Sequence, residues 1–327
     1  MIMKKHVLQS VVFLTLLAGA MFLAGCVNEQ NDPVGSLGEI DILTRIDNFN
    51  NSLTSTLADE AINPRDLNTT KACAVSSGDI VQTFMGMRIG ASLPVFGSSA
   101  TASSAMIYWG GLICGVPASY SCYAVLNDIA WAGNFLNGVR RDPLYVYEFG
   151  SRVTRQDVAN ARKEADVEIY IPEGFRFGDG IGVMHNAIIH KVMTIKSSGG
   201  QPGDQLSSIP SELEYFRSTT FINSNNKMLD FAWDSTKEYG FFNLSMMPES
   251  SKPTAYQVKI KTILAKFVEI YVTYPKYLVD VDMLVNEYME MIEADNTILA
   301  ADKEAFYGAF TVAAYAPRVW LIYNERD

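Results

Sequence analysis

Histidine and cysteine are scarce in this chain, and their scarcity limits the chemistry that it can perform. Its 327 residues include three histidines and four cysteines. His185 and His190 are the histidines of the main body, and their five-residue spacing would place them about 140° apart on a helix. They cannot therefore bind one metal ion together, as an i, i+4 pair would. No Cys-x-x-Cys or Gly-x-Ser-x-Gly segment occurs either. The sequence thus predicts no metal site and no cofactor, and it favours a non-enzymatic role.

Clustered positive charge is also missing. The formal net charge is −10, with 26 lysines and arginines against 36 aspartates and glutamates. Beyond the N-terminal segment the basic residues form no cluster larger than the pair Arg140-Arg141. Nucleic acids and anionic lipid surfaces are held by groups of lysines and arginines. We therefore expect no nucleic-acid partner and no electrostatic binding to an anionic membrane surface.

No apolar run in the main body is long enough to cross a bilayer. The most apolar stretch, 105–118, falls short of the roughly 20 residues required and contains Pro117. It lies within a segment, 78–138, that is rich in glycine, alanine and serine. Pairs of glycines four residues apart let two helices approach closely. We expect close-packed helices at 79–92, 99–115 and 119–139. The alternative is a membrane-active protein that inserts 78–138 into a target bilayer.

The N-terminus, in contrast, carries an export signal. Lys4 and Lys5 precede a short apolar run, which ends in Leu23-Ala24-Gly25-Cys26. A basic start and a short apolar run are typical of secretory signals, and the last four residues resemble the lipobox of bacterial lipoproteins. The resemblance implies that residues 1–25 are a signal peptide and that Cys26 carries the lipid, palmitate included. Residues 26–35 are polar and would form a tether of about 30 Å when extended.

The same resemblance implies a location in the cell envelope. Val27, rather than an aspartate, follows the lipobox cysteine, and in the sorting pattern of Gram-negative bacteria this favours the outer membrane. We therefore expect the acylated Cys26 to hold the protein on the lipid bilayer, with another envelope protein as a partner.

Helical periodicity dominates the rest of the chain. The clearest amphipathic pattern is a stripe of apolar residues at helical spacing, formed by Val281, Leu284, Val285, Tyr288, Met289 and Ile292. We expect a mainly α multi-helix bundle with at most one short two-stranded β element, built from 144–149 and 167–171. Small-residue helices would occupy 36–196 and longer amphipathic helices 211–327. The loop 197–210 either separates two domains or lies within one continuous domain.

Two prolines and three cysteines give further expectations. Pro117 and Pro317 should interrupt or end their helices. Cys73, Cys114 and Cys122 remain beyond the lipobox. A break at Pro117 could fold Cys114 back onto Cys122, so this pair is the favoured disulfide, although Cys73 could pair with either.

The residues that could carry chemistry lie around a glycine-rich loop, 173–182. Its spacing does not match a phosphate-binding motif, and Asp179 would repel an anion, so we favour Asp179 as a helix N-cap. Asp179, His185 and Asn186 are the candidate catalytic residues, and a hydrolase using His185 is a further alternative. A packed core histidine is the favoured role for His185. Glu287, Glu290 and Glu293 offer oxygens to a cation but are typical of a solvated helix face.

Three segments together resemble a loose group of uncharacterised exported bacterial proteins and lipoproteins. They are Ser77-Gly78-Asp79, the run from Ile181 to Asn186, and Ala309 to Trp320. Ala314 and Ala316 depart from the more polar residues common in that group. The resemblance implies no activity, so it supports the helical architecture and leaves the function open. From the sequence as a whole we expect a lipid-anchored envelope protein that binds or scaffolds at the membrane surface.

Overall fold

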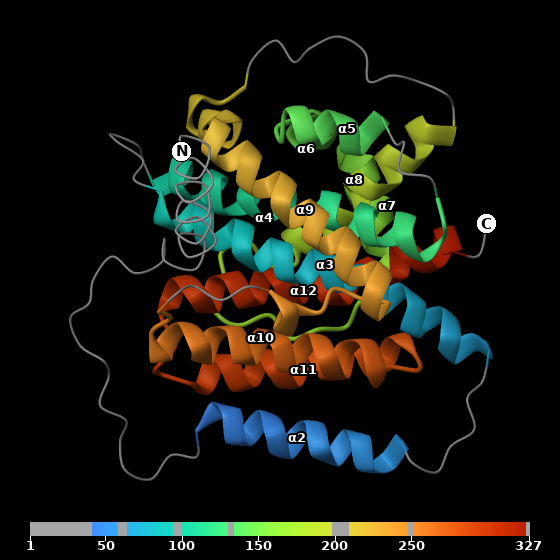
Figure 1. Cartoon of the computed structure of the whole chain (residues 1–327), viewed down its shortest axis with the longest axis vertical. Helices are drawn as coiled ribbons and strands as arrows, with labels where there is room; N and C mark the ends of the chain where they lie inside the picture. Colours follow the sequence, from blue (N-terminus) through green and yellow to red (C-terminus); the bar gives the residue numbers. More distant parts are fainter. Residues whose placement is uncertain are drawn as a thin grey trace, which may run out of the picture.

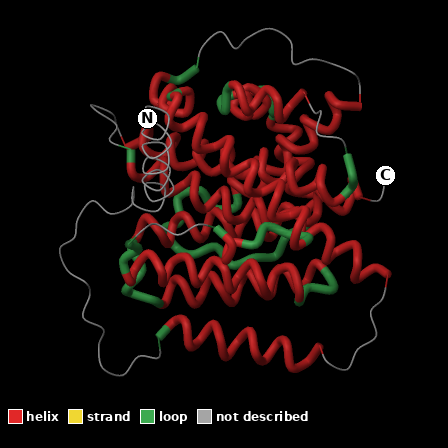
Figure 2. The backbone as a smooth tube through the Cα atoms, viewed as in Figure 1, coloured by secondary structure: helices red, strands yellow, loops and turns green. Residues whose placement is uncertain are grey.

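The computed structural model describes residues 41–57, 64–93, 100–129, 134–197, 209–247 and 252–324 (Figure 1). The predicted signal peptide, Cys26 and the predicted tether, together with most of the loop 197–210, lie outside these ranges. The described part is helical, with no strand (Figure 2), which confirms a mainly α multi-helix bundle. Its elements are α2 (Ile42–Leu57), α3 (Pro64–Ser92), α4 (Ala100–Leu126), α5 (Asn134–Arg141), α6 (Tyr145–Ser151), α7 (Arg155–Ala165), α8 (Gly180–Ser197), the 3-10 helix η1 (Ser211–Arg217), α9 (Thr219–Tyr239), the 3-10 helix η2 (Leu244–Met246), α10 (Ala255–Thr273), α11 (Leu278–Ala294) and α12 (Ala300–Asn324).

The central pair of helices is α3 and α4, and small residues set how closely they pack. A Cβ atom placed on Gly86 would lie 2.0 Å from the carbonyl oxygen of Gly110. One on Gly90 would lie 2.3 Å from the carbonyl oxygen of Met106. Neither position has room for a side chain, so the predicted close approach of small-residue helices is confirmed. The helix boundaries differ from those expected, because α3 begins earlier, at Pro64.

Helices from both sides of the 197–210 loop share one hydrophobic core. The C-terminal helix α12 packs along α3 and α8, and α9 crosses α4 (Figure 1). On the opposite side, α10 and α11 lie next to each other, and α2 runs along their outer side. The Tyr288 hydroxyl of α11 donates a hydrogen bond of 3.1 Å to Asn50 Oδ1 of α2.

The prediction that proline would interrupt two helices is wrong. Pro117 lies inside α4 and Pro317 inside α12. A proline at 317 cannot donate to the carbonyl of Ala313, and the Tyr271 hydroxyl donates to that oxygen instead, at 2.8 Å. For α4, extensive burial against α3 outweighs the roughly 3 kcal/mol that an internal proline costs.

The favoured disulfide is absent from the structure. Because α4 continues through Pro117, Cys114 and Cys122 are eight residues apart on one helix, about 12 Å by helical rise and beyond disulfide reach. Within the described residues, these two cysteines and Cys73 are free and buried. Burial raises the pKa of each thiol to about 12, so the three thiols are unreactive.

Neither segment expected to form a strand does so. Residues 144–149 fall largely in α6, where Val146 and Phe149 are buried, so tertiary packing overrides their β propensity. Residues 167–171 are extended but lie along α11 rather than beside another strand. The backbone N–H of Tyr170 donates to Asn286 Oδ1 at 2.6 Å, and that of Glu168 to Asp282 Oδ2 at 3.4 Å. Side chains of a helix thus take the place of a partner strand.

Candidate functional site

A polar cluster lies in the middle of the bundle, where α3, α4, α8 and α12 meet. Its centre is Asp79 of α3, whose Oδ1 lies 3.2 Å from Nε2 of His185 on α8. Both side chains have 0% exposed surface. Neither of these two atoms has a hydrogen bond of good geometry within the described residues, so a close electrostatic contact joins them rather than a directed bond.

The second carboxylate oxygen of Asp79 is held by directed hydrogen bonds. The Ser119 hydroxyl of α4 donates to Asp79 Oδ2 at 2.5 Å, and the Trp320 indole N–H of α12 donates to Ser119 Oγ at 2.6 Å. The Trp320 ring stacks on Tyr123, with centroids 4.5 Å apart. Polar side chains therefore join three helices through the core. Trp320, the last side chain in this series of hydrogen bonds, is fixed by its stacking on Tyr123.

Burial decides the protonation of this cluster. It raises the pKa of Asp79, and the contacts with His185 and Ser119 only partly oppose the rise. A serine nucleophile requires a base that accepts its proton, which is normally a histidine. Here the Ser119 hydroxyl donates to Asp79 and not to His185. The side chains of Ser119, Asp79 and His185 have no exposed surface. In this conformation the arrangement can hold helices together but cannot reach a substrate.

Asn186, the neighbour of His185, joins α8 to α12. Its Nδ2 donates to the carbonyl oxygen of Tyr315 at 2.8 Å, and its Oδ1 lies 3.2 Å from Nδ1 of His185. His185 and Asn186 are 0% and 2% exposed. The three segments of the resemblance therefore converge, because they supply Asp79, the His185-Asn186 pair, and Tyr315 with Trp320.

Asp179 lies at the start of α8, in a hydrogen-bond network separate from the Asp79 cluster. Its backbone carbonyl accepts from Val183 at the beginning of the helix, as an N-cap residue does. Its carboxylate accepts two bonds from Arg162 of α7, at 2.8 and 2.7 Å, and one of 2.9 Å from the Tyr315 hydroxyl. Burial alone would raise the pKa of Asp179, but these bonds outweigh it and lower the pKa.

The other candidate ligands stay apart. His190 contacts the Tyr323 hydroxyl at 2.9 Å and Glu164 at 3.3 Å, so it does not join His185. Glu293 accepts a bond of 2.6 Å from the Tyr170 hydroxyl. Over the described ranges, no group of three or more histidine, cysteine, aspartate or glutamate side chains is placed to hold a metal ion.

Two buried ion pairs were not predicted from the sequence. Arg88 of α3 contacts Asp302 of α12 at 2.6 Å, and Arg318 of α12 contacts Asp282 of α11 at 2.7 Å. All four side chains are 10% exposed or less. A charged residue within an otherwise apolar helix segment, as at Arg88 and Arg318, is the signal that could have indicated them.

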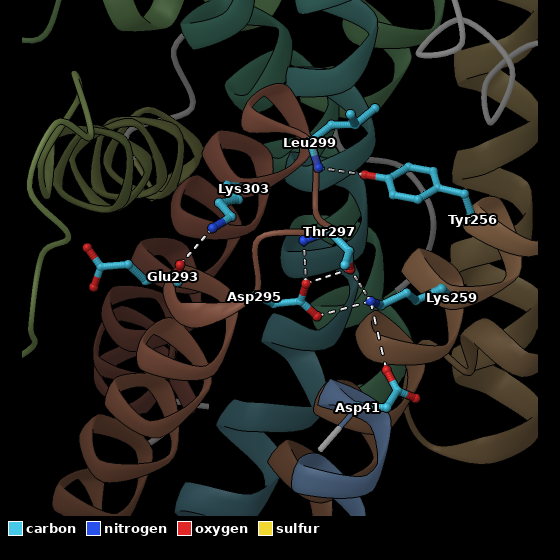
Figure 3. A network of polar contacts seen from close by, with 8 residues as sticks. All are labelled: Asp41, Tyr256, Lys259, Glu293, Asp295, Thr297, Leu299 and Lys303. Carbon is cyan, nitrogen blue, oxygen red and sulfur yellow. Dashed lines mark hydrogen bonds and ion pairs between the residues drawn. The ribbon is translucent and has the colours of Figure 1, made fainter. Parts of the chain in front are cut away.

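A further polar network fixes the connection between α11 and α12 (Figure 3). The ammonium group of Lys259 contacts Asp295 Oδ2 at 3.0 Å, Thr297 Oγ1 at 2.5 Å and Asp41 Oδ1 at 3.9 Å. The Tyr256 hydroxyl accepts from the backbone N–H of Leu299 at 3.0 Å. This network joins the residue before α2 to the body, so it serves architecture.

Comparisons with known proteins add no identity. Nothing among protein-family models, curated proteins or solved structures matches this chain.

Proposed function

We propose that the protein is anchored by a lipid on Cys26 in the bacterial cell envelope, in the outer membrane, and that it binds or scaffolds another envelope protein without catalysing a reaction. The lipobox resemblance at Leu23-Ala24-Gly25-Cys26 supports the anchor. The observation that carries the non-enzymatic role is the complete burial of His185, Asp79 and Ser119. A hydrolase built on His185 would need a route by which substrate reaches it.

The packing of the helices in 78–138 also supports a stably folded segment rather than one that inserts into a target bilayer. The central part of this segment forms the α3–α4 pair, which other helices cover. None of the helices in the described ranges is both long enough and apolar enough to span a bilayer. Purified protein should therefore leave liposomes intact, and release of trapped dye would favour the membrane-active alternative.

The anchor is tested by Cys26→Ser in cells. We expect the variant to leave the membrane fraction and to lose metabolic labelling with palmitate, because the lipobox position no longer has a thiol to carry the lipid and the other three thiols are buried. Cys73→Ser is the matched control, since Cys73 is buried and should leave both readouts unchanged. Persistent labelling of the Cys26→Ser protein would refute the assignment.

A further inference from the structure

The extended segment 167–171 is bound to the helical body along only one of its two edges. On that edge, the backbone N–H of Glu168 donates to Asp282 of α11. The next bond joins the backbone N–H of Tyr170 to Asn286, whose Nδ2 in turn donates to the Glu168 carbonyl oxygen at 3.4 Å. Successive residues of an extended chain direct their backbone N–H and C=O groups to opposite edges. The residues that alternate with Glu168 and Tyr170 therefore direct theirs away from α11.

The second edge, formed by Val167, Ile169 and Ile171, is a free edge. Their backbone N–H and C=O groups make no hydrogen bond to any described residue. Each of the three residues is partly exposed, and a buried backbone group without a partner is rare, so water reaches this edge. An unpaired edge of this kind can accept an extended chain from another molecule as an additional strand.

The surface beside the free edge carries unpaired negative charge. The Tyr170 ring is 40% exposed, and its hydroxyl donates to Glu293 Oε2 at 2.6 Å. This bond raises the pKa of Tyr170, and the charges of Glu290 and Glu173 add to the rise, so these carboxylates lie close to the ring. Glu168, Glu173, Glu290 and Glu293 form no ion pair within the part of the chain that the structure describes. A positively charged partner is therefore complementary to this surface.

A groove of about 550 Å³ lies at the end of the segment and continues the same surface. Glu173 and Glu293 contribute carboxylates to its walls. Phe175 and Tyr307 contribute aromatic rings, whose centroids are 5.6 Å apart. Carboxylates beside aromatic rings suit the long side chain of a lysine or an arginine, which packs its methylene groups on apolar surface and places its charge near an acid.

The two cations that line this groove are held by other groups. Lys303 donates to the backbone carbonyl of Glu293 at 2.7 Å, and the Glu293 carboxylate points away from it (Figure 3). Arg176 pairs with Glu304 and donates to Ser104 Oγ at 3.0 Å. Neither cation therefore neutralises the carboxylates around Tyr170.

We propose that residues 167–171 bind an extended basic segment of a partner protein as an added β-strand. The backbone of that segment would pair with the free edge, and its lysine or arginine side chains would meet the four unpaired carboxylates. The inference deepens the proposed scaffolding role by naming the chemistry of the partner, and it rests on that role.

The test uses the purified full-length protein in detergent and a capped peptide of alternating lysine and valine, with amide hydrogen exchange followed by NMR. We expect the amide protons of Val167, Ile169 and Ile171 to exchange at least roughly tenfold more slowly when the peptide is bound. Those of Glu168 and Tyr170 already have acceptors and should change little, so they are an internal control. Binding should weaken at high salt, because exposed charges are screened.

Protein variants test the charges separately from the backbone. The double variant Glu173→Gln with Glu290→Gln alters two exposed side chains that have no bonded partner among the described residues, so its fold should be intact. We expect it to bind the peptide roughly threefold to tenfold more weakly. Glu238→Gln with Glu269→Gln, exposed on α9 and α10, is the charge-matched control and should bind as the wild type does.

Any of three results would overturn the proposal. They are the absence of binding at millimolar peptide, binding that leaves the exchange of the free-edge amides unchanged, and equal binding by a charge-reversed peptide of alternating glutamate and valine. Failure of the scaffolding role is seen separately, by cross-linking in cells. A cross-linked partner without peptide binding would reject this site alone, whereas peptide binding without a cross-linked partner would reject the scaffolding role.

Discussion

Asp79 occupies a position at which a carboxyl group must be satisfied by the protein alone. Its side chain has no exposed surface, and its partners are His185 and Ser119, the latter fixed in turn by Trp320. Removing one member of a buried network leaves the others without partners, which costs more than the net stability of any single bond. The cluster therefore specifies how α3, α4, α8 and α12 fit together.

Asp79→Ala and Asp79→Asn should differ clearly in stability. The alanine variant leaves Ser119 and His185 without their partner, and we expect it to lower the free energy of unfolding by about 3 kcal/mol. The asparagine variant keeps an oxygen for Ser119 and should cost much less. Urea unfolding measures both. Equal losses for the two variants would contradict a role through hydrogen bonding.

The raised pKa of Asp79 also gives a pH dependence with a defined sign. A native pKa above the unfolded value, about 3.9, means that the native state holds the proton more tightly. This contribution to stability is complete below the unfolded pKa and is lost as the pH rises through the native pKa. Wild type should therefore lose stability relative to Asp79→Asn over that window. Parallel pH curves for the two proteins would argue against the assignment.

Single residues of this site were only partly predictable. His185 and Asn186 stand out in the sequence because histidine is scarce and the pair opens a helix. Asp79 could not be assigned to them, since its contacts come from residues 40 and more positions away.

At the scale of elements, the α3–α4 pair depends on missing side chains. Its glycines let backbone carbonyls of one helix approach the Cα atoms of the other, and large residues elsewhere in the bundle fill the remaining space. A packed interior cannot absorb extra atoms without shifting backbone. The spacing of the small residues made this pairing predictable, whereas the helix ends were not.

Gly86→Ala should separate these two helices. The added methyl group would lie 2.0 Å from the Gly110 carbonyl oxygen, so we expect the free energy of unfolding to fall by about 1–3 kcal/mol or more. Gly180→Ala is the control, because a Cβ there meets nothing within 4 Å and the position starts α8. Thermal unfolding compares the two. A Gly86→Ala protein as stable as Gly180→Ala would show that the close approach is not required.

The errors at this scale share one physical cause. Local rules treat proline as a helix breaker and β-branched aromatic runs as strands. Here Tyr271 satisfies the Ala313 carbonyl that Pro317 leaves, and Asn286 satisfies the backbone of the extended Tyr170. These partners lie more than 40 residues away along the chain, so no local pattern could indicate them.

At the scale of the whole molecule, the body is a helical bundle whose core draws on both halves of the described chain. Its candidate chemistry is enclosed, while its proposed anchor precedes the described residues. The chain between Cys26 and Ile42, fully extended at about 3.3 Å per residue, would keep the start of α2 within roughly 50 Å of the bilayer. A partner should then be found close to the membrane surface and only when the anchor is intact.

Cross-linking in living cells tests this account most directly. The wild type and Cys26→Ser would be cross-linked in parallel and the products identified by mass spectrometry. We expect a discrete envelope protein to be linked to the wild type and lost with Cys26→Ser. An anchored wild type that links to no protein, or a partner that Cys26→Ser retains in full, would contradict the proposed role at the membrane surface.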